Sequence, residues 1–194
     1  GPWTKLGLML EPPTPEESNV VTGEHYGFTD NPSLVHNPDG RFFLYYRIKF
    51  PGLEGGCTYA VAIADKLEGP YVHHPERVVN NPTYIEDPYV FVRDGLFYML
   101  ITDNHNPQGM QGMLLTSEDG LSFDYYSGQG YGVISDYIQP EQLPADPAEI
   151  PGGCFERPQL LIKDGSPTHL FTPCGQKVGD DMKTRCYLFE IGDA

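Results

Sequence analysis

Three short polar segments recur along the chain, each ending in a proline that precedes an apolar run. They are Asp30-Asn31-Pro32, Glu86-Asp87-Pro88 and Glu156-Arg157-Pro158. A single acid in such a place has an ordinary structural role, because it can cap a turn or pair with an arginine such as Arg47. Acids from three such segments that meet in one place would instead shift one another's pKa values. Carboxyl groups with separated pKa values are suited to general acid-base catalysis.

The runs that follow these segments share one pattern. Each contains an apolar stretch, a turn and a second, aromatic-rich stretch, and the turns are Asn37-Pro38-Asp39-Gly40, Arg93-Asp94-Gly95 and Lys163-Asp164-Gly165-Ser166. Asp-Gly between alternating apolar residues is the strongest short-range signal for a β-hairpin. A third strand-like run follows each hairpin, and the first two units add a fourth at residues 71–79 and 123–128. We therefore predict three units of antiparallel strands.

Four antiparallel strands per unit are typical of the blades of a β-propeller. A Greek-key sandwich also has short strands, but it does not explain an acid-x-proline segment at the start of every unit. We therefore predict an all-β fold, a β-propeller with about three blades in this chain, at residues 28–80, 84–128 and 155–192, the last without its outer strand. The acid-x-proline segments are the blade starts, and we expect them to face the central channel.

The first ten residues, GPWTKLGLML, resemble the segment GPYVHHPERVV at residues 69–79. Residues 1–10 are therefore predicted to form the outer strand of a preceding blade, so that the chain begins within a repeat; a plain N-terminal arm is the alternative. Three blades are too few to close a ring, because propellers have about 4 to 8 of them. We expect a homo-oligomer, most simply a dimer, that covers the open blade faces and edges.

Composition limits the partners of this chain. Its formal net charge is −15, from 12 basic and 27 acidic residues, which argues against nucleic acid because cationic contacts to phosphate dominate such binding. No stretch approaches the roughly 18 apolar residues of a membrane helix, and no signal segment opens the chain. The four cysteines lack the spacing of a zinc site. The sequence thus predicts no nucleic acid, membrane or cofactor and favours a neutral polar ligand, while its localisation stays open.

Two ordered segments carry a resemblance to a known family. IEDPYVFVRDGLFYML (residues 85–100) and FERPQLLIKDGSPTHLF (residues 155–171) resemble the blade starts of five-bladed β-propeller glycoside hydrolases, the clan of family 43 and related bacterial glycosyl hydrolases. The resemblance covers essentially the whole chain and implies hydrolysis of a terminal glycosidic bond. That reaction uses one carboxyl group to protonate the leaving oxygen and another to activate water.

The resemblance also implies roles for particular residues. Glu156 matches the general acid, and Asp87 matches the carboxylate that orients this acid and tunes its pKa. The family's general base is an aspartate on the first blade. This chain has Asn31 where such an aspartate would stand in its first complete unit; if residues 1–10 are the end of a preceding blade, the base lies upstream. Because an amide cannot take a proton from water, catalysis would need another carboxylate, and Asp30 and Glu86 are the candidates.

Three further residues are candidates for binding substrate. Arg157 could bind a sugar hydroxyl or an acidic substrate group, or simply neutralise Asp87. His169 could line the channel or contact Glu156, and a purely structural histidine is the alternative. His105 stands in a polar loop, and in the related enzymes an axial histidine can help to hold a calcium or sodium ion. No cluster of oxygen ligands accompanies it in the sequence, so no metal site is predicted.

Three functions are therefore compared. A glycosidase is supported by the order of Asp87 and Glu156, and a non-catalytic carbohydrate-binding or assembly module is supported by Asn31. A protein-interaction propeller gives no reason for acids at every blade start. We favour the glycosidase, with carbohydrate as the partner.

Overall fold

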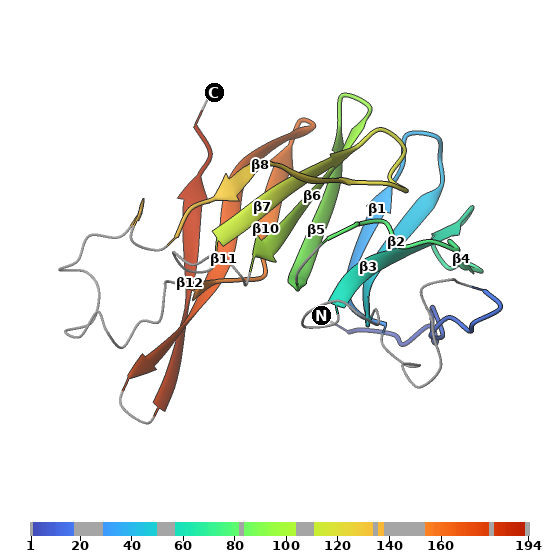
Figure 1. Ribbon diagram of the computed structural model, residues 1–194, viewed down its shortest axis with the longest axis horizontal. Helices are drawn as coiled ribbons and strands as arrows, with labels where there is room; N and C mark the ends of the chain where they lie inside the picture. Colours follow the sequence, from blue (N-terminus) through green and yellow to red (C-terminus); the bar gives the residue numbers. More distant parts are fainter. Residues whose placement is uncertain are drawn as a thin grey trace.

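The computed structural model consists of three antiparallel β-sheets that follow one another along the chain (Figure 1). It describes residues 2–17, 29–49, 57–81, 84–103, 111–133, 136–137, 154–178 and 181–192. The predicted all-β class is confirmed. Within these described ranges, no helix has the length and apolar character that a membrane crossing requires.

Each sheet is built from a run of consecutive strands. The first has the order β1-β2-β3-β4 and the second the order β5-β6-β7-β8, whereas in the third β10, β11 and β12 are neighbours and β9 pairs with β11. The strands of the first sheet are β1 (Asp30–His36), β2 (Phe42–Lys49), β3 (Cys57–Ala64) and β4 (Val72–His73). Those of the second are β5 (Ile85–Arg93), β6 (Leu96–Asp103), β7 (Gln111–Ser117) and β8 (Asp124–Tyr131). Those of the third are β9 (Cys154–Phe155), β10 (Gln159–Lys163), β11 (Ser166–Val178) and β12 (Asp181–Glu190).

The three predicted hairpins are formed by β1–β2, β5–β6 and β10–β11. In the last two, Asp-Gly is the whole loop, and both of its residues have positive φ: 53° and 80° at Asp94 and Gly95, and 52° and 78° at Asp164 and Gly165. Two consecutive left-handed residues are the mark of a type I′ turn, whose twist matches that of the flanking strands. The Asp-Gly signal therefore located these turns correctly.

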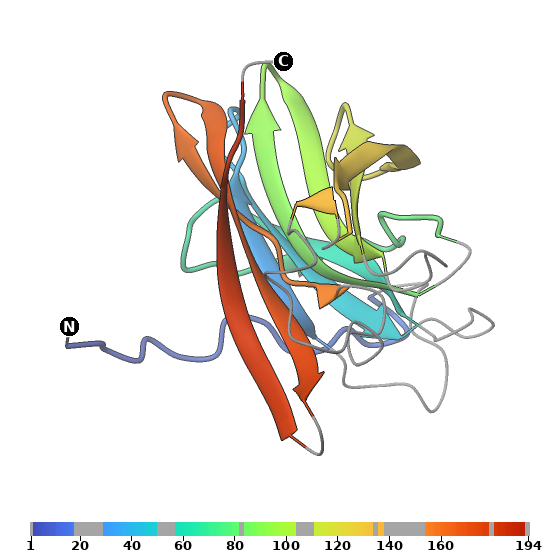
Figure 2. The ribbon, with the colours of Figure 1, turned by 90° about the vertical axis from the view of Figure 1, so that its left-hand side faces the viewer.

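Two predicted outer strands differ from the structure. Residues 2–10 form no strand, and the side chains of Trp3, Leu6 and Leu8 are exposed. Figure 2 shows this N-terminal segment leaving the sheets. A segment becomes a β-strand only when it hydrogen-bonds to a neighbouring strand, and none of the described strands pairs with residues 2–10. In the first sheet, the outer strand shrinks from the predicted residues 71–79 to Val72–His73, because Pro75 has no N–H to continue the ladder.

Every inner strand carries one extra residue at its blade start. Asn31 and Pro32 lie opposite one residue of β2, and Asp87 and Pro88 lie opposite one residue of β6. In the third sheet, residues 156–158 separate β9 from β10, although both strands pair with β11 over a gap of only two residues. The middle residue of each blade start has positive φ: 46° at Asn31, 55° at Asp87 and 46° at Arg157. The same β-bulge therefore opens all three sheets.

The first two sheets pack through a large aromatic and aliphatic core. Tyr45 is fully buried there, and its hydroxyl group donates to the carbonyl oxygen of Gly120 at 2.9 Å. A smaller core joins the second and third sheets, and its buried members are Leu100, Tyr131, Phe155, Leu170 and Cys174. Packing on both sides of the second sheet thus fixes the spacing of the three blade starts.

We predict that Gly120→Ala strongly destabilises the junction between the first two sheets. A Cβ atom at Gly120 would lie 2.7 Å from the Tyr45 hydroxyl oxygen and 2.8 Å from the Phe97 ring, in backbone with φ of 73°. We expect the free energy of unfolding to fall by about 3 kcal/mol in urea titrations, from overpacking and left-handed strain together.

Gly95→Ala is the matched control for this substitution. Gly95 also has positive φ, 80°, but nothing lies within 4 Å of its Cβ position. The substitution there should cost only the strain of a left-handed non-glycine residue, about 1 kcal/mol in the free energy of unfolding. Equal losses in the two variants would contradict a close-packed junction.

Candidate functional site

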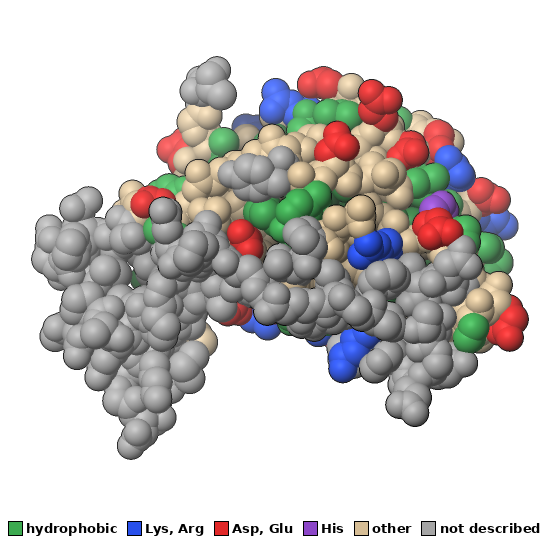
Figure 3. Space-filling view, in the orientation of Figure 1, with side chains coloured by type: hydrophobic (Ala, Val, Ile, Leu, Met, Phe, Trp, Pro, Cys, Tyr) green, Lys and Arg blue, Asp and Glu red, His purple; other side chains and the backbone are tan. Residues whose placement is uncertain are grey.

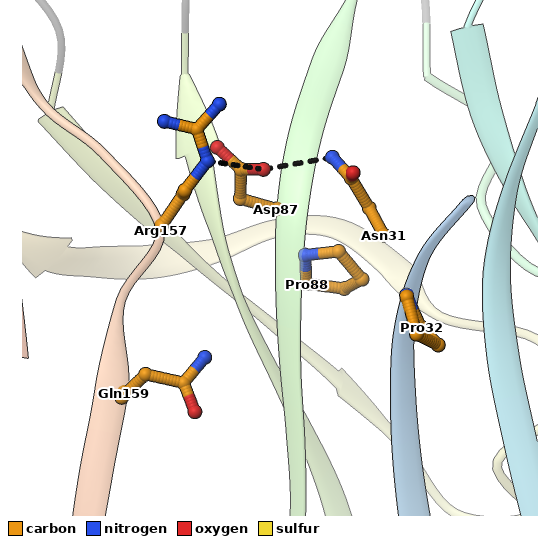
Figure 4. A pocket seen from close by; sticks show the side chains of 6 residues that line it. All are labelled: Asn31, Pro32, Asp87, Pro88, Arg157 and Gln159. Atoms are coloured by element: carbon orange, nitrogen blue, oxygen red, sulfur yellow. Dashed lines mark hydrogen bonds and ion pairs between the residues drawn. The ribbon is translucent and has the colours of Figure 1, made fainter. Parts of the chain in front are cut away.

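The three left-handed residues of the blade starts converge on one pocket. The Asn31 amide nitrogen Nδ2 donates to Asp87 Oδ1 at 2.7 Å, and Arg157 Nε lies 3.7 Å from the same oxygen. Figure 4 shows these three side chains pointing toward one another from the starts of the three sheets. The pocket has a volume of about 180 Å³, and its lining residues are Asn31, Pro32, Asp87, Pro88, Arg157 and Gln159.

Cross-sheet hydrogen bonds hold the blade starts side by side. The backbone N–H of Val90 donates to Ser33 Oγ at 2.9 Å, which ties β5 to β1. The backbone N–H of Arg157 donates to Thr102 Oγ1 at 3.2 Å, which ties the third blade start to β6. Thr102 is fully buried. These bonds satisfy backbone N–H groups between the sheets, so they fix the backbone from which the pocket side chains project.

Asp87 is the buried acid at the centre of the pocket. Its side chain is 7% exposed, and Oδ2 has no hydrogen-bond partner among the residues that the structure describes. Burial raises the pKa of Asp87 from 3.8 to about 6, the positive charge of Arg157 lowers it, and the negative charges of Glu86 and Glu156 raise it. Asp87 therefore changes its charge just below neutral pH, in the range where proton transfer is useful.

Asp30 and Glu86 share Arg47 and do not line this pocket. Arg47 Nε and Nη2 each donate to one carboxylate oxygen of Asp30 at 2.7 Å. Arg47 Nη1 donates to Glu86 Oε1, which also accepts from the Tyr84 hydroxyl group. The arginine side chain is only 14% exposed, so both acids are bound in a sheltered ion-pair network. Asp30 and Glu86 therefore form the ion pairs with an arginine that the sequence analysis gave as the structural alternative to a catalytic role.

Glu156 lies next to the pocket and is joined to it by Arg157. Arg157 Nη1 donates to Glu156 Oε2 at 2.9 Å, while Nε of the same side chain faces Asp87. The backbone N–H of Glu156 donates to the carbonyl oxygen of Pro173 at 3.1 Å, and its carbonyl oxygen accepts from Thr172 Oγ1 at 2.7 Å. One exposed guanidinium group thus connects the two predicted catalytic acids, and the Glu156 backbone is held on both sides.

The two candidate histidines do not join this group. His169 lies on β11 opposite Leu161 and Glu190, and its ring nitrogen Nδ1 is 3.1 Å from Thr168 Oγ1. It is not among the residues that line the pocket. His105 lies outside the described residues. Within the described ranges, no three histidine, cysteine or acidic side chains gather as a metal site.

Sequence reasoning did not identify Thr102, Ser33 or Gln159. Of the residues that it did name, the middle residues of the blade starts, Asn31, Asp87 and Arg157, line the pocket, whereas the first residues Asp30, Glu86 and Glu156 do not. The bulge is responsible, because one extra residue reverses the facing of the strand residues before it. The sequence does contain a signal for this geometry: the middle residues include Asn31 and Asp87, and Asn and Asp are the types that best tolerate positive φ.

The structure is similar to several solved glycoside hydrolases. A thermostable family-43 glycoside hydrolase superposes with a TM-score of 0.54 at 14% sequence identity, over 91% of this chain and 54% of that chain. An endo-arabinase from Bacteroides thetaiotaomicron gives 0.55 at 12% identity, over 87% and 58% of the two chains. An endo-1,4-beta-xylanase from the same organism gives 0.51 at 15% identity, over 89% and 52%. This chain has the β-propeller fold of family-43 glycoside hydrolases.

These comparisons confirm the fold predicted from the blade starts. At such low identity the similarity concerns the fold alone, and this chain spans about half the length of those enzymes. No family model matches the sequence, and no curated protein is significantly similar to it.

We predict that Asp87→Asn removes a pH-dependent loss of stability. The folded-state pKa of Asp87 is raised above its unfolded value, so ionisation costs the wild type stability as the pH rises from about 4 to about 6. The raised pKa corresponds to roughly 3 kcal/mol. We expect the variant to equal the wild type at about pH 3.5 and to exceed it by up to that amount at pH 7.5.

Urea unfolding at both pH values measures this difference. Asp94→Asn is the control, because Asp94 also has left-handed backbone but its side chain is 88% exposed. Its effect should not depend on pH. A parallel loss of stability in Asp87→Asn at both pH values would contradict a buried, strained charge.

Proposed function

We propose that this chain is a glycoside hydrolase-like protein that cleaves a terminal glycosidic bond by general acid-base catalysis. The observation that carries the proposal is the pair of acids Asp87 and Glu156, which are joined by one arginine, Arg157. Asp87 and Arg157 line the pocket between the blade starts, and Glu156 is adjacent to Arg157. Two carboxyl groups in different environments are what this reaction requires.

The two acids differ in ways that suit separate roles. The Glu156 side chain is 29% exposed and is paired with Arg157, which lines the pocket; in this proposal it protonates the oxygen of the departing alcohol. Asp87 is 7% exposed, and its negative charge beside the pocket stabilises the positive charge that develops on the sugar ring in the transition state. Arg157 holds both carboxylates in place before a ligand binds.

Carbohydrate is the ligand class that fits the surface. Acidic side chains spread over the face seen in Figure 3, and the chain carries a net charge of −15. A strongly acidic protein repels anionic ligands, whereas a neutral sugar offers hydroxyl donors to carboxylates and acceptors to Asn31 and Gln159. Among the similar structures are an endo-arabinase and an endo-1,4-beta-xylanase, and we propose a pentose-containing glycan as the first substrate to test.

One observation favours a second function, a carbohydrate-binding module without catalysis. The first blade start presents the Asn31 amide to the pocket, and its acid, Asp30, is bound by both oxygens to Arg47. A site without a free base would bind a sugar and leave its glycosidic bond intact.

We predict that Glu156→Gln separates these functions. The amide keeps the shape of the side chain but cannot donate the proton, so kcat/KM for xylose or arabinose oligosaccharides, whose leaving group is a sugar alcohol, should fall by at least about 100-fold. The corresponding 2,4-dinitrophenyl glycosides need little protonation and should lose less than about 10-fold. Equal losses on both kinds of substrate would assign Glu156 another role. Calorimetric binding of xylose or arabinose oligosaccharides without any wild-type hydrolysis would establish the binding module instead.

We also propose that the chain forms a homo-oligomer, most simply a dimer. Trp3, Leu6 and Leu8 are 93%, 86% and 73% exposed, and the outer face of the third sheet exposes a second apolar group consisting of Leu161, Phe171 and Leu188. Two such surfaces on one chain favour association. Light scattering at micromolar concentration should give twice the monomer mass, and Trp3→Ser combined with Leu6→Ser and Leu8→Ser should reduce it to the monomer mass. A wild-type monomer would contradict this proposal.

A further inference from the structure

Thr102 is a fully buried threonine at the junction of the second and third sheets. It lies on β6, paired with Glu86 of β5 on one side and with Gly112 of β7 on the other. Its hydroxyl oxygen accepts the backbone N–H of Arg157 at 3.2 Å, and its side chain also hydrogen-bonds to that of Tyr131. A hydroxyl group has one hydrogen and two lone pairs, so Thr102 can donate to Tyr131 while it accepts from Arg157.

A glycine lets Tyr131 reach this junction. Thr102, Gly112 and Tyr131 form a row across β6, β7 and β8, and a Cβ atom at Gly112 would lie 2.2 Å from the Tyr131 ring. The ring therefore lies over Gly112. The Tyr131 hydroxyl group donates to the carbonyl oxygen of Phe155 at 3.4 Å. Two side chains of the second sheet thus hold the backbone on either side of Glu156.

Arg157 is held in a conformation that arginine does not favour. Its φ is 46°, and left-handed backbone costs about 1 kcal/mol in a residue with a Cβ atom. Its Nε atom lies 3.7 Å from Asp87 Oδ1, and Nη1 donates to Glu156 Oε2 at 2.9 Å (Figure 4). The Arg157 side chain is 64% exposed, which weakens these ion pairs. The buried hydrogen bond to Thr102 is therefore the main restraint on this backbone.

We propose that Thr102 is a positioning residue of this site: its hydroxyl group keeps Arg157 in left-handed backbone and so holds the guanidinium group beside Asp87 and Glu156. The catalytic use of the two acids rests on the proposed function, whereas their placement does not. Valine has nearly the shape of threonine but no hydroxyl group. In Thr102→Val, the Arg157 N–H loses its acceptor, and the backbone relaxes toward negative φ. That change carries the arginine side chain away from both acids.

The charge of Asp87 reports the position of Arg157. Burial raises the pKa of Asp87, the charge of Arg157 lowers it, the charges of Glu86 and Glu156 raise it, and the Arg157 backbone N–H lowers it. Both contributions of Arg157 therefore have the same sign, and moving this residue away must raise the pKa. We expect the pKa of Asp87 to rise by at least about 0.5 in Thr102→Val, measured by NMR titration of its carboxyl carbon. Thr102→Ser keeps the hydroxyl group and should retain the wild-type pKa.

Two further variants separate positioning from a general loss of packing. Thr58 is also fully buried, and its hydroxyl group donates to the carbonyl oxygen of Val79 at 2.9 Å. Thr58→Val should therefore lose stability in urea titrations without a shift in the pKa of Asp87. Arg157→Gly removes the guanidinium group and accepts left-handed backbone freely. If Thr102 acts through Arg157, adding Thr102→Val to Arg157→Gly should change the pKa of Asp87 by less than about 0.2.

An unchanged or lower pKa of Asp87 in Thr102→Val would overturn the inference, because Thr102 would then not hold Arg157 beside this acid. A rise of the same size in Thr58→Val, or in the Arg157→Gly background, would overturn it as well. If Thr102→Val does not fold, Thr102→Cys takes its place with the same expected direction, because a thiol is a weak acceptor. None of these measurements needs hydrolysis, so a wild type without glycosidase activity would reject the proposed function and leave this test decisive.

Discussion

One extra residue at the start of each inner strand places Asn31, Asp87 and Arg157 in left-handed backbone and turns them into a shared pocket. Asparagine and aspartate accept this conformation readily, but arginine does so at a cost. At Arg157 the cost is offset by the hydrogen bond from its N–H to Thr102 and by its ion pairs with Asp87 and Glu156. Strained backbone that neighbouring contacts hold in place is typical of functional sites, and here it recurs at equivalent positions of three sheets.

The same bulge sorts the acids of the blade starts into two environments. Asp30 and Glu86 lie one residue before it and meet a largely buried arginine, Arg47, which offers each of them donors. Asp87 lies in the bulge itself, where it meets one amide and an exposed guanidinium group at 3.7 Å. The charges of Asp30 and Glu86 are both balanced by Arg47, so these two acids have a structural role. At Asp87, the nearby positive charge of Arg157 does not offset the cost of burying the carboxylate, and for that reason its pKa rises toward neutrality.

Much of this architecture could be predicted from the sequence because it depends on local signals. Asp94-Gly95 and Asp164-Gly165 fix two turns through their own backbone preferences, and the proline-led repeats indicate three sheets. The facing of the blade-start residues could not be predicted, because a bulge breaks the alternation on which such reasoning rests. Residues 2–10 have a strand-like pattern but form no strand in this chain, because strand pairing depends on a partner strand that the pattern does not reveal. The sequence offered an ion pair with Arg47 only as an alternative role for the blade-start acids, because whether such a pair forms depends on the distance between strands.

Arg157 links the two acids, so the position of its guanidinium group affects the charge around Asp87. Its charge lowers the pKa of Asp87, and the charge of Glu156 raises it. If the guanidinium group turns toward a bound sugar, Asp87 loses a neighbouring cation, and its pKa must rise. The same movement frees Glu156 from its partner at 2.9 Å. Arg157, anchored by its backbone to the neighbouring sheet, is thus the charged group through which a change at Glu156 would reach Asp87.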